Sequence, residues 1–207
     1  MLATNHRERR LACQFLLAFL VSCVLDDATG QTQEVTYELS AAPEIELLSL
    51  YTSGGMSFYG PRYRLFGDGR LVREIRLKNL DRTLASEEAY LGPDDVRLLV
   101  DLIVAAQLPE MTPASLRASL GHEPEPATDA STSVLELRFE TYQSPGGELH
   151  APFTPRVMML APMLQARFAP GAPEPQGFIT LREALDGYFP TAASEALREV
   201  ARTGGDQ

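Results

Sequence analysis

The chain has 207 residues, with 18 Lys and Arg against 28 Asp and Glu, so its formal net charge is −10. Hydrophobic residues make up 44% and charged residues 22%, a mixture typical of a globular protein rather than a disordered or fibrous one. The acidic excess would repel phosphate backbones, and the basic residues are scattered, so nucleic acid is not an expected partner. Among the basic residues only Lys78 is a lysine, which is typical of a GC-rich bacterial genome.

The first 22 residues have the layout of a secretory signal peptide. Three arginines in the first ten residues precede an apolar run, 11–25, that only Gln14 and Ser22 interrupt. This run is shorter than the roughly 20 apolar residues that span a bilayer, so a permanent transmembrane helix is the weaker interpretation. We therefore expect residues 1–22 to direct export and to lie outside the folded domain.

The apolar run contains Leu20-Val21-Ser22-Cys23, which resembles the bacterial lipobox. In that motif the cysteine thiol receives a diacylglycerol, the chain is cut before it, and the lipid anchors the protein in the membrane. The sequence thus favours an anchor on Cys23. A second cleavage site follows Ala28-Thr29-Gly30, a small-x-small pattern that would release a soluble chain beginning at Gln31. Both sites fit, and the sequence leaves the choice open.

Both cysteines of the chain, Cys13 and Cys23, lie in this N-terminal segment. The exported domain therefore has no disulfide, no thiol nucleophile and no cysteine-based metal site, although its compartment would permit a disulfide. The remainder divides into a polar tether at 23–43, whose weak alternation allows an edge strand, a folded domain at 44–190, and a C-terminal helix and tail at 191–207.

The clearest local pattern is a tight hairpin at Gly67-Asp68-Gly69. Alternating runs on its two sides predict strands at 62–66 and 70–77, and Asp-Gly suits the turn because both residues tolerate a positive φ. Two registers fit. We prefer a three-residue loop with a bulge, which sets Arg62 opposite Glu74, because a two-residue turn would set two arginines against each other.

The segment that begins at Gly92-Pro93-Asp94-Asp95 predicts a helix at 93–107. Proline suits the first helical position, and carboxylates in the first turn interact favourably with the positive end of the helix dipole. One face carries the apolar residues Val96, Leu99, Val100, Ile103 and Ala106 or Gln107, with Leu98, Leu102 and Val104 beside them. We expect this face to pack against a sheet.

The other expected elements are shorter. Strands are predicted at 45–51, 133–142 and 148–152, with the last two joined as a second hairpin through Pro145-Gly146-Gly147. Short helices are predicted at 113–120, 181–188 and 192–202, the second of them with a capping box at Thr180–Glu183, and a loop at 169–177. Residues 156–160 and 163–168 are apolar enough to be buried, but Pro162 prevents one continuous helix.

These elements predict an α+β fold, namely an antiparallel sheet of about five strands with helix 93–107 packed on one face and short helices towards the C-terminus. Residues 63–72, the helix after Pro93 and the segment 128–135 resemble uncharacterised secreted or lipoprotein domains of bacteria. In those domains a Gly-Asp-Gly hairpin precedes a Pro-initiated helix and a strand entered through Thr-Asp. The resemblance covers about 60–142, implies an α+β domain and brings no catalytic residues with it.

No catalytic, cofactor-binding or metal-binding residue is assigned from the sequence. His122 and His150 each lie next to a turn without a second ligand at i+2 or i+4, whereas zinc needs three or four convergent ligands. Prolines interrupt the acidic stretch 123–129 where a calcium loop needs flexible residues, so a solvated linker is favoured. An aromatic set could line a groove but is more simply core; it consists of Tyr51, Phe58, Tyr59, Tyr63 and Phe66.

Two function classes remain. The first is a non-enzymatic lipoprotein of the cell envelope, or its secreted counterpart, that binds another envelope protein or a small ligand. The second is a carboxylate-dependent hydrolase, which needs two Asp or Glu side chains facing each other about 5–10 Å apart across a cleft. The sequence contains no paired-carboxylate motif, so it favours the binding module.

Overall fold

The structure is a computed structural model that describes residues 34–54, 59–77, 82–123 and 129–189. Its folded unit begins at Val35. The expected signal peptide, Cys23 and the helix expected at 192–202 lie outside the described residues. Within the described ranges, no helix combines the length and the hydropathy that crossing a bilayer requires.

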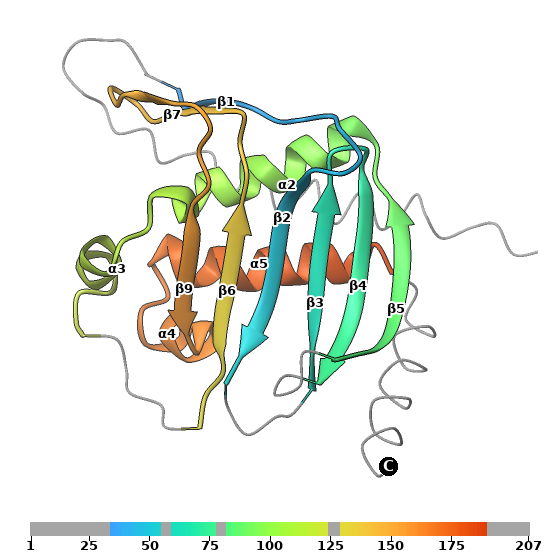
Figure 1. Cartoon of the computed structure of the whole chain (residues 1–207). Helices are drawn as coiled ribbons and strands as arrows, with labels where there is room; N and C mark the ends of the chain where they lie inside the picture. The colour runs from blue at the N-terminus through green and yellow to red at the C-terminus, as the bar shows by residue number, and fades with distance from the viewer. Residues whose placement is uncertain (1–33, 55–58, 78–81, 124–128, 190–207) are drawn as a thin grey trace, which may run out of the picture. The chain divides into compact units, whose positions relative to one another are not determined.

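The main sheet is antiparallel throughout and has six strands in the order β5-β4-β3-β2-β6-β9 (Figure 1). The strands are β2 (Glu46–Ser53), β3 (Tyr59–Phe66), β4 (Arg70–Leu77), β5 (Arg82–Tyr90), β6 (Thr132–Leu137) and β9 (Arg156–Leu160). Strands β2 to β5 form a meander, and β6 pairs with the other side of β2. The expected α+β class is confirmed.

The hairpin register preferred from the sequence is also confirmed. Arg62 lies opposite Glu74, and Leu65 lies opposite Leu71. Gly69 has a φ of +83°, which only glycine adopts easily, and its N–H donates a hydrogen bond to the Phe66 carbonyl at 2.9 Å. The turn is therefore the three-residue loop, the register that we preferred because it pairs Arg62 with Glu74.

The helices are α2 (Pro93–Ala105), the 3₁₀ turn η1 (Leu108–Glu110), α3 (Pro113–Leu120), α4 (Pro162–Phe168) and α5 (Pro173–Gly187). Helices α2 and α5 both lie on one face of the main sheet (Figure 1). The apolar face expected of the first helix is buried there, with Val96, Leu99, Val100 and Ile103. Together with sheet residues such as Leu48 and Leu135 it forms the core.

A second, three-stranded sheet has the order β1-β7-β8, with β1 (Thr36–Glu38), β7 (Thr141–Gln143) and β8 (Leu149–His150). The edge strand that the tether sequence allowed is therefore present as β1. The single strand expected at 133–142 is wrong, because the chain changes sheet between β6 and β7. There the Arg138 N–H donates to the Leu47 carbonyl and Phe139 pairs with Phe153, outside both sheets. The second hairpin is correct only for β7 and β8.

The loop expected at 169–177 is wrong in its second half, since α5 begins at Pro173. The segment that suggested a capping box at Thr180–Glu183 lies inside that helix. Within this helix, a Cβ on Gly177 would lie 2.3 Å from the Cβ of Ala106, so the glycine lets α5 approach the end of α2 closely. At its start, Pro173 occupies the first helical position and Glu174 lies in the first turn, both of which favour a helix N-terminus.

The strand β5 was not expected from the sequence at all. Its residues Ala85, Glu87 and Ala89 lie opposite Ile75, Arg73 and Leu71 of β4. Two alanines and a carboxylate give no hydrophobic alternation, although they face the helix-covered side of the sheet. The strand pairs with β4 along its length, and Glu87 forms an ion pair with the buried Arg73.

Candidate functional site

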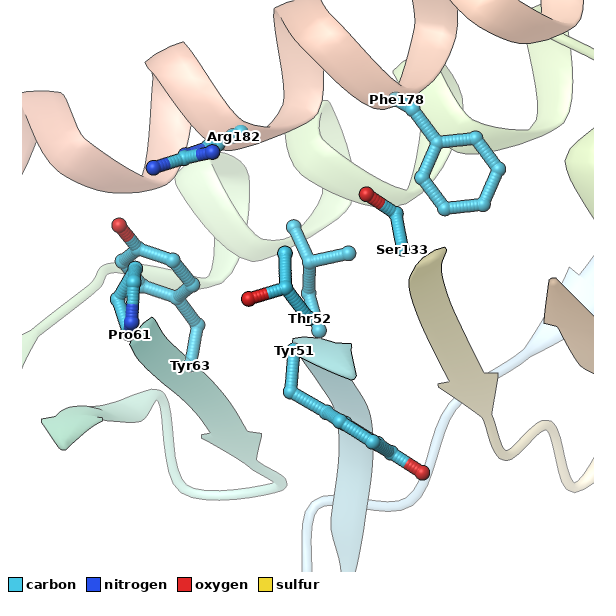
Figure 2. A pocket seen from close by; sticks show the side chains of 8 residues that line it. Tyr51, Thr52, Pro61, Tyr63, Ser133, Phe178 and Arg182 are labelled. Atoms are coloured by element: carbon cyan, nitrogen blue, oxygen red, sulfur yellow. The ribbon is translucent and has the colours of Figure 1, made fainter. Parts of the chain in front are cut away.

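A small cavity lies between α5 and the sheet, where Figure 2 shows Arg182 and Phe178 of the helix above Thr52 and Tyr63. Its lining also includes Leu50, Tyr51, Pro61 and Ser133. The volume is about 20 Å³, which is room for about one water molecule. The cavity therefore has no space for an organic ligand.

A charged cluster around the buried Arg73 lies beside this cavity and joins α5 to β4 and β5. Arg73, only 4% exposed, donates from Nη1 to Asp186 at 3.1 Å and from Nε to Glu87 at 3.0 Å. Tyr63 donates to Asp186 at 2.6 Å, and the Arg73 guanidinium lies 4.3 Å from the ring centre of Phe189. Burial, together with the hydrogen bond to Asp186, raises the pKa of Tyr63. These contacts join α5 to β3, β4 and β5.

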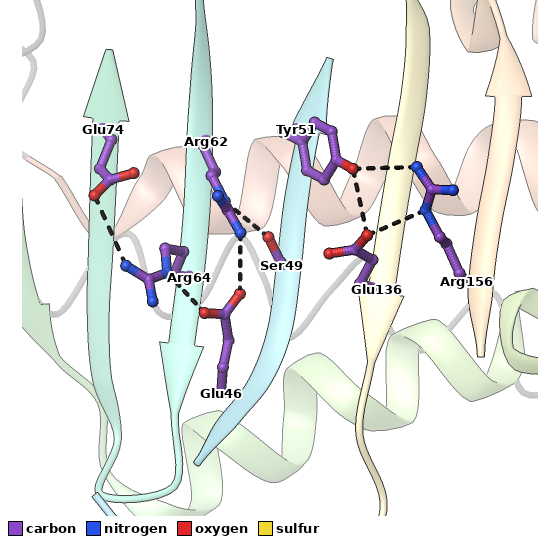
Figure 3. A network of polar contacts seen from close by, with 8 residues as sticks. All are labelled: Glu46, Ser49, Tyr51, Arg62, Arg64, Glu74, Glu136 and Arg156. Atoms are coloured by element: carbon purple, nitrogen blue, oxygen red, sulfur yellow. Dashed lines mark hydrogen bonds and ion pairs between the residues drawn. The ribbon is translucent and has the colours of Figure 1, made fainter. Parts of the chain in front are cut away.

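The sheet face opposite α2 and α5 carries a network of ion pairs (Figure 3). Glu46 contacts Arg64 at 2.7 Å and Arg62 at 3.5 Å, and Glu136 contacts Arg156 at 3.1 Å. Tyr51, Ser49 and Glu74 complete the network through further contacts with these residues. Each of these acidic side chains has a basic partner on the same face, so the charges of this surface are compensated.

A much larger groove, of about 640 Å³, lies at the end of the domain where the chain enters the fold. Its walls are β1 with the segment that follows it, the Gly67–Gly69 turn, and the start of α2. The lining consists of Tyr37, Glu38, Leu39, Ser40, Ala41, Leu47, Gly67, Asp68, Gly69, Leu91, Pro93, Val96, Arg97 and Glu140. Such a volume lies in the range of ligand-binding pockets.

The Gly-Asp-Gly turn lies in close contact with two other segments of the groove, the one that follows β1 and the one that leads into α2. A Cβ on Gly67 would lie 2.4 Å from the Ala42 carbonyl oxygen, and a Cβ on Gly69 would lie 2.3 Å from that of Leu91. The Leu91 N–H donates to the Gly69 carbonyl at 2.9 Å, which fixes the entry to α2. Asp68 is exposed between the glycines, and its carboxylate accepts a hydrogen bond from the Arg70 N–H at 3.0 Å. The residues expected to act in a turn therefore also build a groove.

The groove combines apolar and acidic lining. Leu47, Leu91 and Val96 are buried, whereas the side chains of Glu38, Asp68 and Glu140 are exposed. Glu38 and Glu140 come together because β1 pairs with β7, and the Glu140 N–H donates to the Glu38 carbonyl at 2.9 Å. Within the ranges that the structure describes, neither of these two carboxylates forms an ion pair.

Tyr37 lies at the same wall and contacts the outer side of α2. Its hydroxyl donates to Asp101 at 2.5 Å. Burial, followed by that hydrogen bond and the charge of Asp101, raises the pKa of Tyr37 to about 12, and the nearby Arg97 acts in the opposite direction. The phenol therefore stays protonated at neutral pH and ties β1 to α2.

The candidate residues considered from the sequence do not gather at one place. His122 follows α3, with Nδ1 2.6 Å from the Glu123 carbonyl oxygen, and His150 lies on β8 with its ring 5.3 Å from that of Phe153. Among the described residues no group of three or more His, Cys, Asp or Glu side chains is arranged to hold a metal ion. Of the aromatic set, Tyr63 is buried in the core, and Tyr51 and Tyr63 both border the small cavity below α5, which has no room for an organic ligand. The side chains of Phe58 and Tyr59 lie outside the described part of the structure.

Sequence reasoning missed the acidic residues of the groove. Glu38 lay in the expected tether, and Glu140 lay inside an expected strand, so neither belonged to a motif. The one local indication was Asp68 between two glycines, a spacing that is also compatible with close approach of other backbone segments. No protein-family model matches the chain, and no curated protein matches its sequence. Fold and groove together define an α+β domain with a candidate ligand groove at the end where its chain begins.

Proposed function

We propose that this protein is an exported bacterial cell-envelope protein, anchored by a lipid on Cys23, and that its folded domain is a non-enzymatic binding module. The N-terminal arginines, the apolar run and the lipobox-like residues support export and anchoring. The resemblance of residues 60–142 to secreted or lipoprotein domains of bacteria supports the same location.

The groove is the observation that carries the binding function. Its two walls meet at backbone contacts around Gly67 and Gly69, and its floor is apolar, so it is a built feature of the fold. If Cys23 is the anchor, residues 24–34 reach at most roughly 40 Å when fully extended. The groove would then lie within reach of partners at the membrane surface.

The alternative of a carboxylate-dependent hydrolase has weaker support. A catalytic acid of that class needs a carboxyl group whose pKa is raised, usually by burial. The three carboxylates that line the groove, Glu38, Asp68 and Glu140, are all exposed. Their arrangement suits ligand attraction better than acid catalysis.

Metabolic labelling with a palmitate analogue tests the anchor. The wild-type chain expressed in a bacterium should become labelled and should fractionate with membranes, whereas Cys23→Ser should remain unlabelled because it has no thiol to acylate. Unlabelled soluble protein beginning at Gln31 would contradict the anchor and leave export intact.

Photo-crosslinking in intact cells tests the binding module. A photoreactive residue at Ala41, which is exposed in the groove, should capture a partner. The same residue at Glu183, exposed on α5 and outside the groove, is the matched control. Equal adducts at both positions, or adducts from Glu183 alone, would contradict a binding function for the groove.

A further inference from the structure

We infer that the groove binds a cationic peptide segment in which apolar side chains alternate with basic ones. This inference rests on the proposed function, since it names the ligand class of the same groove. It depends on three features of the described residues: the charges that line the groove, its apolar floor, and the contrast with the opposite sheet face.

The lining charges are unbalanced. Glu38 ends β1 opposite Thr141, and Glu140 directly precedes β7, with its N–H bonded to the Glu38 carbonyl; Asp68 lies on the turn that forms another wall. Arg97 is the one basic residue among the described lining residues. The lining therefore carries three acidic side chains against one basic one, and a positive group bound in the groove would balance this excess. The net charge of −10 would also attract a cationic partner over longer distances.

The floor of the groove excludes a simple metal ion as the intended ligand. The described carboxylates are not grouped as metal ligands, and Leu47, Leu91 and Val96 provide apolar surface that an ion cannot use. The carboxylates come from different walls, so a complementary ligand carries more than one positive group on an apolar frame. An extended peptide of basic and apolar residues has this chemistry.

On the sheet face away from α2 and α5, the acidic side chains of the ion-pair network have basic partners. There Glu46 and Glu136 are each paired with arginines at 2.7–3.5 Å. The groove carboxylates Glu38 and Glu140 have no such partner among the described residues. The groove therefore combines carboxylates that have no ionic partner among the described residues with a concave, partly apolar surface, which is the arrangement that recognises a cation.

Fluorescence anisotropy on the purified full-length protein in non-ionic detergent tests this inference. The probes are three labelled peptides of equal length in which leucine alternates with lysine, glutamine or glutamate. We expect the lysine peptide alone to bind, and binding to weaken at about 0.5 M salt, where charges are screened. Glu38→Gln with Glu140→Gln should weaken it about tenfold, because two charge contacts are lost.

Two further variants separate the groove from general charge effects. Glu148→Gln with Glu183→Gln removes the same charge at exposed positions outside the groove and should leave the affinity unchanged. Ala41→Trp, which places a large side chain in the groove, should abolish binding, and Arg97→Gln should strengthen it. Thermal unfolding of every variant confirms that each is folded.

The outcomes distinguish this inference from the proposed function. Equal weakening by both double variants, or no binding of the lysine peptide, would overturn the cationic ligand. Tighter binding of the glutamine or glutamate peptide that Ala41→Trp abolishes would also overturn it, but would leave the groove as a binding site. The proposal that the groove is a binding site is tested separately by the crosslinking experiment, in which equal adducts at Ala41 and Glu183 would contradict it.

Discussion

Gly67 and Gly69 flank the same aspartate, yet different contacts require each of them. Gly69 adopts a φ of +83° and lies against the Leu91 carbonyl, so both conformation and space exclude a side chain. Gly67 has no such φ, but the carbonyl oxygens of Ser40 and Ala42 occupy the place of its Cβ. A turn motif that is readable from the sequence thus also joins β1, the hairpin and α2.

Alanine substitutions at these glycines should therefore be costly. We expect Gly67→Ala and Gly69→Ala each to lower the free energy of unfolding by more than about 2 kcal/mol, because backbone atoms must move. Gly121→Ala is the matched control: its φ is +71°, but nothing lies within 4 Å of its Cβ position, so strain alone should cost about 1 kcal/mol. Urea unfolding measures all three, and equal losses would contradict the close contacts.

Tyr63 and Tyr142 should make the free energy of unfolding fall at alkaline pH. Burial raises the pKa of Tyr63, and it raises that of Tyr142 together with the charge of Glu110, so the folded state holds these phenol protons more tightly than the unfolded chain. Unfolded tyrosines titrate near about pH 10. The stabilising contribution is therefore complete below about pH 10 and is lost as the pH rises above it.

Urea unfolding at about pH 8 and about pH 11 measures this loss. The free energy of unfolding should fall between the two, and Tyr63→Phe should make the fall smaller because one titrating group is removed. Tyr90→Phe, at a side chain that is 72% exposed, is the control and should leave the fall unchanged. An identical pH dependence for Tyr63→Phe and wild type would show that this phenol does not contribute.

Helix α2 is the element that connects the core to the groove. Its buried face packs in the core through Leu99 and Ile103, while its first turn and Arg97 line the groove. Leu99→Ala and Ile103→Ala should each cost about 2–5 kcal/mol through lost burial and the cavity left behind. Asp68→Ala removes only one exposed hydrogen bond and should cost much less. Thermal unfolding compares them, and an unchanged midpoint for Leu99→Ala would contradict the packing.

Elements with strong local patterns were predictable, and elements defined by distant partners were not. The β3–β4 register and the buried face of α2 follow from turn chemistry and a helical period, both contained within a few residues. By contrast, the place of β5 beside β4 involves the pairing of Glu87 with Arg73, and the close packing of α5 on α2 depends on the approach of Gly177 to Ala106. No spacing within either segment encodes those contacts.

The same reason explains why the groove was not predicted. Glu38 and Glu140 are separated along the chain by most of the main sheet and by α2, and only the pairing of β1 with β7 joins them. Sequence reasoning identified Asp68, but assigned it to the turn alone. Sites assembled by topology become visible only when the strand partners are known.

At the scale of the whole molecule, charge is distributed unevenly over two surfaces. The open sheet face pairs its arginines and glutamates, whereas the groove at the entry of the chain keeps carboxylates without ionic partners among the described residues. A charged side chain that already has an ionic partner contributes little binding free energy to a new ligand. A charged side chain without such a partner contributes more. We therefore expect the proposed binding at the groove rather than on the open sheet face.

The most direct test of this account is two-dimensional NMR of the nitrogen-15-labelled protein, titrated with a mixed library of cationic, neutral and anionic fragments. The account predicts that the amide shifts that change cluster around the groove, at Gly67, Gly69, Leu91 and Val96. Shifts that cluster instead on the open face, at Ser49, Arg62 and Glu136, would contradict the groove as the binding site.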